Sequence, residues 1–193
     1  DPNKDLPRVL ERTVIDAAKL FFESKKYDLA AARFVAFQKE FPLSALAPFA
    51  LEKAGASFAQ INKIDQALSA YDLYLKTYPK LPAAKDIRWS AAEMSATAKL
   101  YLKAAEHYQQ FNIMFPADGA QKSASLKAAE NFRLAGKFSD AVNEYEKHLK
   151  TVKAPAEQMR VLRLISASAV KASNGSVALN ALERLSKLVR QPD

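Results

Sequence analysis

Similar residues recur along this chain every 37 positions, and this period constrains its fold more than any other feature of the sequence. An alanine marks each step, at Ala30, Ala67, Ala104, Ala141 and Ala178. Four positions later the chain carries an aromatic residue or leucine, at Phe34, Tyr71, Tyr108, Tyr145 and Leu182. Because several such columns share one period, the sequence predicts a tandem array whose units bury their apolar faces against one another.

Within each repeat the apolar residues are spaced three and four positions apart, which is typical of amphipathic α-helices. A short break divides each repeat into two helical stretches, and proline closes the first three repeats, at Pro42, Pro79 and Pro116. Proline disfavours helical geometry in the residue before it, which predicts helix ends at Phe41, Tyr78 and Phe115. Each repeat is therefore expected to form a helix–turn–helix hairpin, and the hairpins are expected at residues 8–42, 46–79, 83–116, 120–153 and 156–190.

The composition agrees with an all-helical chain. The 193 residues are 49% hydrophobic and include only 4 glycines, which is too few turn residues for an all-β protein. The absence of cysteine excludes disulfides and thiolate metal sites. No apolar run approaches the ~20 residues that cross a bilayer. The sequence predicts one all-α domain over residues 1–193.

A column of small residues stands twelve positions before each landmark alanine, at Ala18, Gly55, Ala92, Ala129 and Ser166. A small side chain lets the two helices of a hairpin approach closely. The aromatic column after the landmark is expected to fill the space between one hairpin and the next. Both columns are therefore interpreted as core positions.

The order of residue types within a repeat resembles the tetratricopeptide repeat (TPR). It consists of a small residue, an aromatic residue, Tyr-x-x-Ala-x-x-x-Tyr and a closing proline. The best matches are Ala54-Gly55…Phe58…Ile64…Ala67…Tyr71…Pro79 and Ala128-Ala129…Phe132…Phe138…Ala141…Tyr145. The resemblance covers about residues 8–190, although the period of 37 is longer than the family's usual 34. It implies a right-handed α-solenoid of about five helix–turn–helix hairpins.

The longer period and two phrases are similar to bacterial cell-envelope TPR proteins, such as outer-membrane assembly lipoproteins and periplasmic factors of the Tol–Pal system. The phrases are Glu40-Phe41-Pro42-Leu43-Ser44 and Thr77-Tyr78-Pro79. This resemblance implies a periplasmic or outer-membrane-associated location, with the cytoplasm as the alternative. The chain begins at Asp1 with no visible signal peptide, so a processed protein or an excised fragment is expected.

The fifth repeat departs from the pattern, because Gly175, Leu182 and Leu185 replace aromatic residues and the closing proline is lost. It is interpreted as a divergent last repeat or a capping element. Its final helix, Val177 to Val189, keeps Leu182, Leu185 and Val189 on one apolar face. No polar capping helix follows, which keeps a longer array as an alternative.

The sequence contains no phosphate-binding, dinucleotide-binding, zinc-protease or nucleophile-elbow motif. Its two histidines, His107 and His148, fall in different repeats, and the column of His148 is otherwise aromatic or leucine, so packing is the better interpretation. Glu52, Glu93 and Glu130 also lie in different repeats, with no nucleophile placed beside them by the period. A non-enzyme without cofactor or metal is expected.

The TPR resemblance places the first helix of each hairpin on a concave wall. The columns assigned to this wall change character from repeat to repeat, as in a surface that selects a partner. The expected partner-binding residues are Ile15, Lys19, Phe22, Phe49, Glu52, Trp89, Glu93, Leu126, Glu130, Arg133 and Arg163. Phe22, Phe49 and Trp89 could form an apolar trough for an extended segment or a helix. The alternative is that Trp89 packs under the loop after Pro79 and the wall is simply solvated.

Three functions follow from these features. The leading hypothesis is a non-catalytic scaffold that holds a peptide or a partner protein in the concave groove. The second is a structural spacer or oligomerisation element of an envelope assembly, contacting through its convex face or its ends. The third uses the net charge of +8 to bind an anionic polymer, but its basic residues are not interleaved with aromatics, so no nucleic-acid partner is expected. The sequence assigns no oligomeric state.

Overall fold

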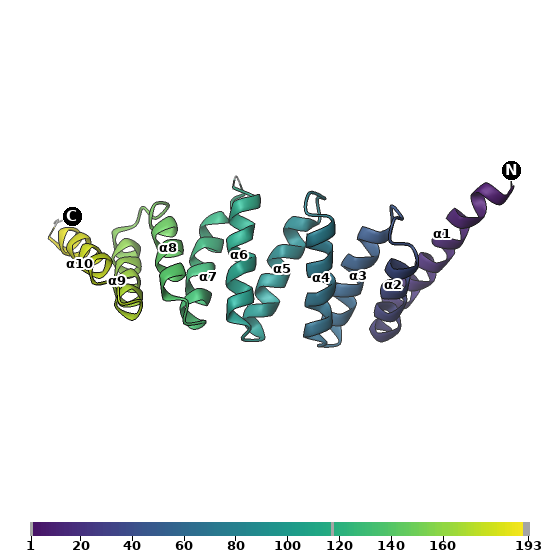
Figure 1. The fold of residues 1–193 in the computed structure, drawn as a ribbon, viewed down its shortest axis with the longest axis horizontal. Helices are drawn as coiled ribbons and strands as arrows, with labels where there is room; N and C mark the ends of the chain where they lie inside the picture. The colour runs from purple at the N-terminus through teal and green to yellow at the C-terminus, as the bar shows by residue number, and fades with distance from the viewer. Residues whose placement is uncertain (1, 117, 191–193) are drawn as a thin grey trace. The chain divides into compact units, whose positions relative to one another are not determined.

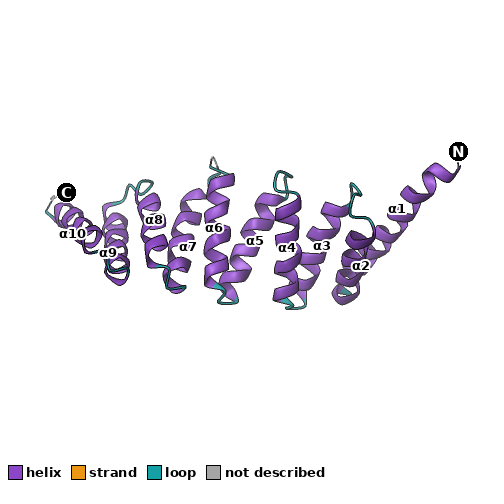
Figure 2. Cartoon of the chain, in the orientation of Figure 1, coloured by secondary structure: helices purple, strands orange, loops and turns teal. Residues whose placement is uncertain are grey.

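The computed structural model describes residues 2–116 and 118–190, with side chains described at 8–116, 118–120 and 123–190. This part of the chain folds into ten α-helices and no strand (Figures 1 and 2). The helices are α1 (Pro2–Glu23), α2 (Tyr27–Glu40), α3 (Ala47–Gln60), α4 (Ile64–Thr77), α5 (Ala84–Thr97), α6 (Tyr101–Met114), α7 (Gln121–Leu134), α8 (Phe138–Leu149), α9 (Pro155–Lys171) and α10 (Gly175–Val189). The all-helical expectation is confirmed.

The helices pair as five hairpins whose second members are α2, α4, α6, α8 and α10. Each second helix begins 37 residues after the one before it. The helices α2, α4 and α6 end just before Phe41, Tyr78 and Phe115, which adopt non-helical geometry ahead of the prolines that exclude them from the helix. The fourth hairpin lacks this proline, and α8 ends earlier at Leu149. At the start of the chain, α1 begins at Pro2, before the expected residue 8.

The turn inside each hairpin is closed by one residue in the left-handed region. These residues, again 37 apart, are Lys25, Asn62, Lys99, Gly136 and Ser173, with φ between 56° and 74°. In the first turn the Lys26 N–H donates to the Phe21 carbonyl at 2.9 Å and the Lys25 N–H donates to the Phe22 carbonyl at 3.0 Å. This pair of bonds is the Schellman arrangement that satisfies the last carbonyls of a helix.

Gly136 is the one glycine in this column, and it allows a test of the turn geometry. We expect Gly136→Ala to lower the free energy of unfolding by about 1 kcal/mol, because an added Cβ is strained at φ 74°. Gly119→Ala is the control, since Gly119 lies in a turn, has no left-handed φ and has open space around it. Urea denaturation measures both variants, and equal losses would contradict the assignment of strain to the left-handed position.

The contacts divide the chain into two compact units, one up to Ala91 and one from Ala92 onward. Unit 1 contains α1 to α4 and the first part of α5, whereas unit 2 contains the rest of α5 and α6 to α10. In unit 1 each of the helices α1 to α4 packs on the next, and in unit 2 each of the helices α6 to α10 packs on the next (Figure 1). The organisation of residues 1–193 as a single domain stays a prediction.

The core of each unit is built from the repeat columns. In unit 1, Phe34 and Phe37 are fully buried among alanines that include Ala30 and Ala54. In unit 2, the column of Phe34 continues as the buried rings of Tyr108 and Tyr145. Small residues on one helix and large rings on the next thus fill the space between hairpins.

Candidate protein-binding surface

The first two hairpins form a hollow lined mainly by aromatic rings and lysine side chains. It is lined by residues of α1, α2 and α3, namely Lys19, Phe22, Glu23, Phe34, Phe49 and Lys53, and has a volume of about 130 Å³. We refer to it as the Phe49 hollow. Its floor is Phe34, which is fully buried, whereas Phe22 and Phe49 are only partly buried.

The three rings hold one another in edge-to-face contact. The Phe34 centroid lies 6.4 Å from that of Phe22 at 67° and 6.0 Å from that of Phe49 at 77°. Such contacts add to the free energy of burying the rings and define their orientation. The aromatic wall is therefore part of the packed core, so its shape is set before any partner arrives.

Two lysines lie over this wall. The Nζ of Lys19 is 5.4 Å from the Phe49 centroid, and the Nζ of Lys53 is 5.5 Å from the same centroid and 5.7 Å from that of Phe22. These are cation–π distances. Asp16 pairs with Lys19 at 2.8 Å and Glu52 pairs with Lys53 at 3.0 Å. The rim is thus rich in polar groups but nearly balanced in charge.

The first helices of unit 2 carry a different surface, made of paired charges. The Nζ of Lys127 on α7 lies 3.1 Å from Glu93 Oε1 on α5 and 5.5 Å from the Tyr108 centroid. Burial raises the pKa of the Tyr108 hydroxyl, the nearby Lys127 lowers it, and Glu93 raises it further. The predicted acidic residue Glu93 therefore already has a cationic partner in this structure.

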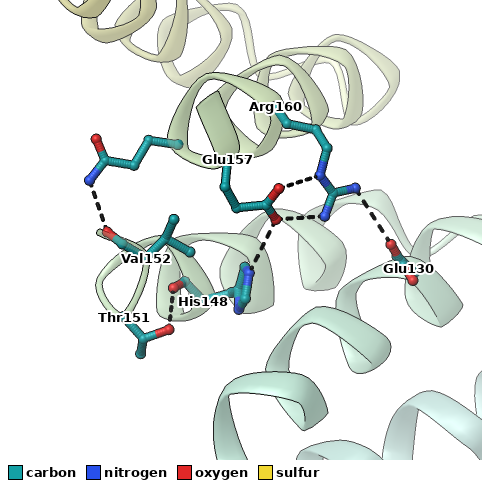
Figure 3. A network of polar contacts seen from close by, with 7 residues as sticks. Glu130, His148, Thr151, Val152, Glu157 and Arg160 are labelled. Atoms are coloured by element: carbon teal, nitrogen blue, oxygen red, sulfur yellow. Dashed lines mark hydrogen bonds and ion pairs between the residues drawn. The ribbon is translucent and has the colours of Figure 1, made fainter. Parts of the chain in front are cut away.

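A second charged group lies where α8, α9 and α7 meet (Figure 3). Arg160 donates to both carboxylate oxygens of Glu157, at 2.8 and 2.7 Å, and lies 3.9 Å from Glu130. His148 Nε2 is 3.7 Å from the same Glu157 carboxylate. The hydrogen bond from Arg160 lowers the pKa of Glu157 below its usual value, with smaller effects from nearby charge. This group fixes the start of α9 against α8.

The predicted site residues divide into groups. Lys19, Phe22 and Phe49 come together at the Phe49 hollow, with Glu52 bound to its rim. Trp89 is partly buried on α5 and does not line that hollow. On unit 2, Glu93, Arg133 and Arg163 are exposed, and Leu126 and Glu130 are partly buried.

The prediction for Ile15 was wrong. Its side chain is fully buried and belongs to the core cluster of Ala18, Phe34 and Phe37. A β-branched aliphatic residue one turn before Ala18 packs inside the first hairpin rather than lining a surface. Ile15 is therefore removed from the candidate binding residues.

Lys53 and Lys127 were missed, although both cations contact aromatic rings of the repeat columns. They occupy the same column, fourteen positions before the landmark alanine, and its other members are Asp16, Ser90 and Leu164. A search for variable polar columns beside the aromatic one would have found them.

A larger apolar hollow lies between α2, α3 and α4. Its volume is about 350 Å³, its apolar lining comprises Val35, Leu51, Phe58, Ala70 and Leu73, and polar side chains such as Gln38 and Asp65 stand at its edge. We refer to it as the Leu73 hollow. One repeat later, Asp72 and Arg88 replace Val35 and Leu51. Burial lowers the pKa of Arg88 while Asp72 opposes this shift, so the apolar lining is specific to the first pair of hairpins.

Within the described residues, no three side chains of the metal-ligating types come together, and no helix is long and apolar enough to span a bilayer.

No family model and no curated protein matches the sequence. Among solved structures, MamA is similar with a TM-score of 0.54 at 12% identity, covering 92% of this chain and 91% of that one. MamA from Desulfovibrio magneticus RS-1 gives 0.51 at 13% identity, covering 95% and 97%. The nearly identical TPR-like repeats of a Podosopora anserina kinesin light chain give 0.50 at 11% identity, covering 92% and 93%. The fold of this chain is the tetratricopeptide-repeat fold.

Proposed function

We propose that this chain is a non-catalytic scaffold that binds a peptide or a partner protein, with the Phe49 hollow as part of the binding surface. The observation that carries the proposal is the pair of partly exposed rings, Phe22 and Phe49, held against the buried Phe34 and crossed by two lysines. Aromatic anchors in a preformed hollow are typical of the few residues that supply most of the binding free energy at interfaces.

The chemistry of the hollow favours an apolar partner side chain. Its rings offer dispersion contacts, while Lys19 and Lys53 can donate hydrogen bonds to carbonyl or carboxylate oxygens on either side. Asp16, Glu52 and Glu23 balance these cations, so a strongly charged partner gains little. We therefore expect a segment with one apolar anchor between polar neighbours.

The remaining predicted residues extend the proposal. Trp89 on α5 is proposed as a second aromatic contact, and the row of Glu93, Glu130, Arg133 and Arg163 is proposed as a separate polar contact surface on unit 2. Leu126, partly buried on α7, belongs to the same surface.

A periplasmic or outer-membrane-associated location remains part of the proposal, supported by the resemblance of the two phrases in the sequence. The cytoplasm is the alternative. Immunodetection in fractionated source cells separates the two locations.

We expect the variant Phe49→Ala/Trp89→Ala to lose a partner that the wild-type chain captures from source-cell extracts. A loss of at least tenfold in the captured amount is expected, because two aromatic anchors are removed. The control is Leu43→Ala/Ile113→Ala, which truncates two exposed residues outside the hollow. Circular dichroism must show that every variant keeps its helices. Equal capture by the aromatic variant would overturn the proposal.

A specific observation favours a second function, the assembly element. The last helix, α10, exposes Leu179, Leu182 and Val189 in the described structure. Exposed apolar side chains gathered on one helix favour association with another protein surface.

A further inference from the structure

A further hollow lies on unit 2, where α8, α9 and α10 meet. Its volume is about 310 Å³ and its apolar lining comprises Leu149, Leu162 and Leu188. Leu149 and Leu162 are buried, and Leu188 on α10 is partly buried. We refer to it as the Leu188 hollow. Its size is at the lower end of the range for sites that bind small molecules.

Three cationic side chains line the same hollow, namely Lys150, Arg184 and Lys187, and none of the described carboxylates does. Glu146 holds Arg184 through two contacts of 2.6 and 3.2 Å. Lys150 and Lys187 are exposed and pair with no carboxylate in the described part of the chain. Residues 147–190 carry nine basic and two acidic side chains, so the surroundings are positive as well. The Leu188 hollow therefore favours an anion, unlike the charge-balanced Phe49 hollow.

The apolar lining is particular to this junction. One repeat earlier, where α6 packs on α7, Asn112 stands in the place of Leu149. There Ser125 replaces Leu162 and accepts a hydrogen bond from Asn112 Nδ2 at 2.9 Å. A polar pair thus occupies the position of the two buried leucines, so a hollow of this character does not follow from the repeat itself.

The cationic rim is equally particular. The Leu73 hollow of unit 1 is the equivalent place three repeats earlier, and Leu73 stands there in the position of Arg184, with the carboxylate of Asp65 at the edge. It is lined by α2, α3 and α4 and stays open although α5 follows α4. A following hairpin therefore does not fill a groove of this kind. The character of the Leu188 hollow is a property of its own side chains.

We propose that the Leu188 hollow binds a single-chain anionic amphiphile of the fatty-acid type. The apolar chain packs on the three leucines, and the carboxylate accepts hydrogen bonds from Lys150 and Lys187. Burial of an apolar chain contributes about 25 cal/mol per Å². The chain thus supplies most of the binding free energy, and the cations select the charge of the head.

The hydrogen-bonding groups of the hollow favour this ligand over a peptide. Lysine and arginine side chains donate and cannot accept, and the amide nitrogen of Gln158 already donates to the Val152 carbonyl at 2.9 Å. The Gln158 side-chain oxygen is thus the one side-chain acceptor among the described residues of the lining. A peptide brings backbone N–H donors that need acceptors, whereas a carboxylate only accepts. The rim therefore matches the head of an amphiphile better than a peptide backbone.

Isothermal titration calorimetry of the chain with decanoate tests the proposal, at about pH 8, where carboxyl groups are ionised and lysines are charged. Decanoate is kept below its micelle-forming concentration. We expect saturable binding of one decanoate per chain. Acetate has the head without the chain, and decylammonium has the chain with the opposite charge. Both should bind at least about tenfold more weakly than decanoate.

The charge-reversal variant Lys150→Glu/Lys187→Glu places the expected effect at this hollow. It should bind decanoate at least about tenfold more weakly than the wild type and bind decylammonium more tightly, because the rim changes sign. Lys150→Gln/Lys187→Gln removes the charges without reversing them and should give a smaller loss in the same direction. Circular dichroism checks that each variant keeps its helices.

The matched control is Lys137→Glu/Lys171→Glu, which makes the same change in net charge. These two lysines lie at the opposite ends of α8 and α9 and line another hollow. The affinity for decanoate should change by less than about twofold in about 0.1 M salt, where charges more than ~10 Å apart are largely screened.

Absence of saturable decanoate binding would overturn the proposal. Equal affinities for decanoate and acetate, or for decanoate and decylammonium, would also overturn it, because the chain or the charge would then not be recognised. An equal loss in the two charge-reversal variants would show general attraction to a basic surface and overturn the assignment to this hollow. Displacement of decanoate by an equimolar blocked acidic peptide containing leucine would assign the hollow to a protein segment instead. None of the substituted lysines lines the Phe49 hollow, so this proposal and the proposed function fail separately.

Discussion

Replacing Phe34 by alanine is expected to lower the free energy of unfolding by about 3–5 kcal/mol. The ring is fully buried and contacts Phe22 and Phe49 at the junction of the first two hairpins. Its removal deletes apolar contacts and leaves a cavity between helices that cannot close without moving both hairpins. Urea denaturation followed by circular dichroism measures the loss.

The control for Phe34→Ala is Leu182→Ala, the same column in the last hairpin. Leu182 is 49% exposed, so its truncation removes fewer contacts and is expected to cost less than about 1 kcal/mol. Both variants change the same position of the repeat, but Phe34 is fully buried and Leu182, a smaller side chain, is half exposed. Equal losses in the free energy of unfolding would show that burial by the following hairpin does not determine how much this position contributes to stability.

Gly55→Ala is expected to lower the free energy of unfolding by about 1–3 kcal/mol. A Cβ added to Gly55 would overlap the ring of Tyr71, which is only 7% exposed and has little room to move. The other hairpins carry alanine or serine in this column. The ring of Tyr71 therefore lies very close to the backbone of α3, and only glycine at position 55 allows that approach.

Two further variants isolate the cause of this loss. Gly175→Ala, at the first residue of α10 with open space around it, should leave the free energy of unfolding unchanged or raise it slightly, since alanine is the better helix former. In Gly55→Ala/Tyr71→Leu the overlapping ring is absent, so the two changes should cost less together than the sum of their separate effects. Strict additivity would contradict the account of the overlap.

The period of 37 was enough to predict the hairpin turns. The breaks in the apolar pattern match the gaps between α1 and α2, α3 and α4, and their later equivalents. The three prolines predicted the ends of α2, α4 and α6 because their steric effect is local. The early end of α8 was not predictable in this way, since Lys153 in place of proline imposes no local constraint.

Surface predictions from the columns were less complete. Lys19, Phe22 and Phe49 were identified because their columns vary, and the structure brings them to one hollow. Ile15 also lies in a variable column but is fully buried, since a column's exposure changes with the hairpin that covers it. The reach of Lys53 over two rings depends on side-chain direction, which the period does not encode. The Leu73 hollow depends on the spacing of three helices and has no signature in one column.

Site-specific photo-cross-linking can locate a bound partner at the Phe49 hollow. A benzophenone amino acid is placed at Lys53, on the rim of the Phe49 hollow, or at Leu73, in the Leu73 hollow, and the captured partner is irradiated in its complex. We expect a cross-linked product from position 53 and none from position 73. A product from position 73 alone would contradict it and assign the partner to the Leu73 hollow.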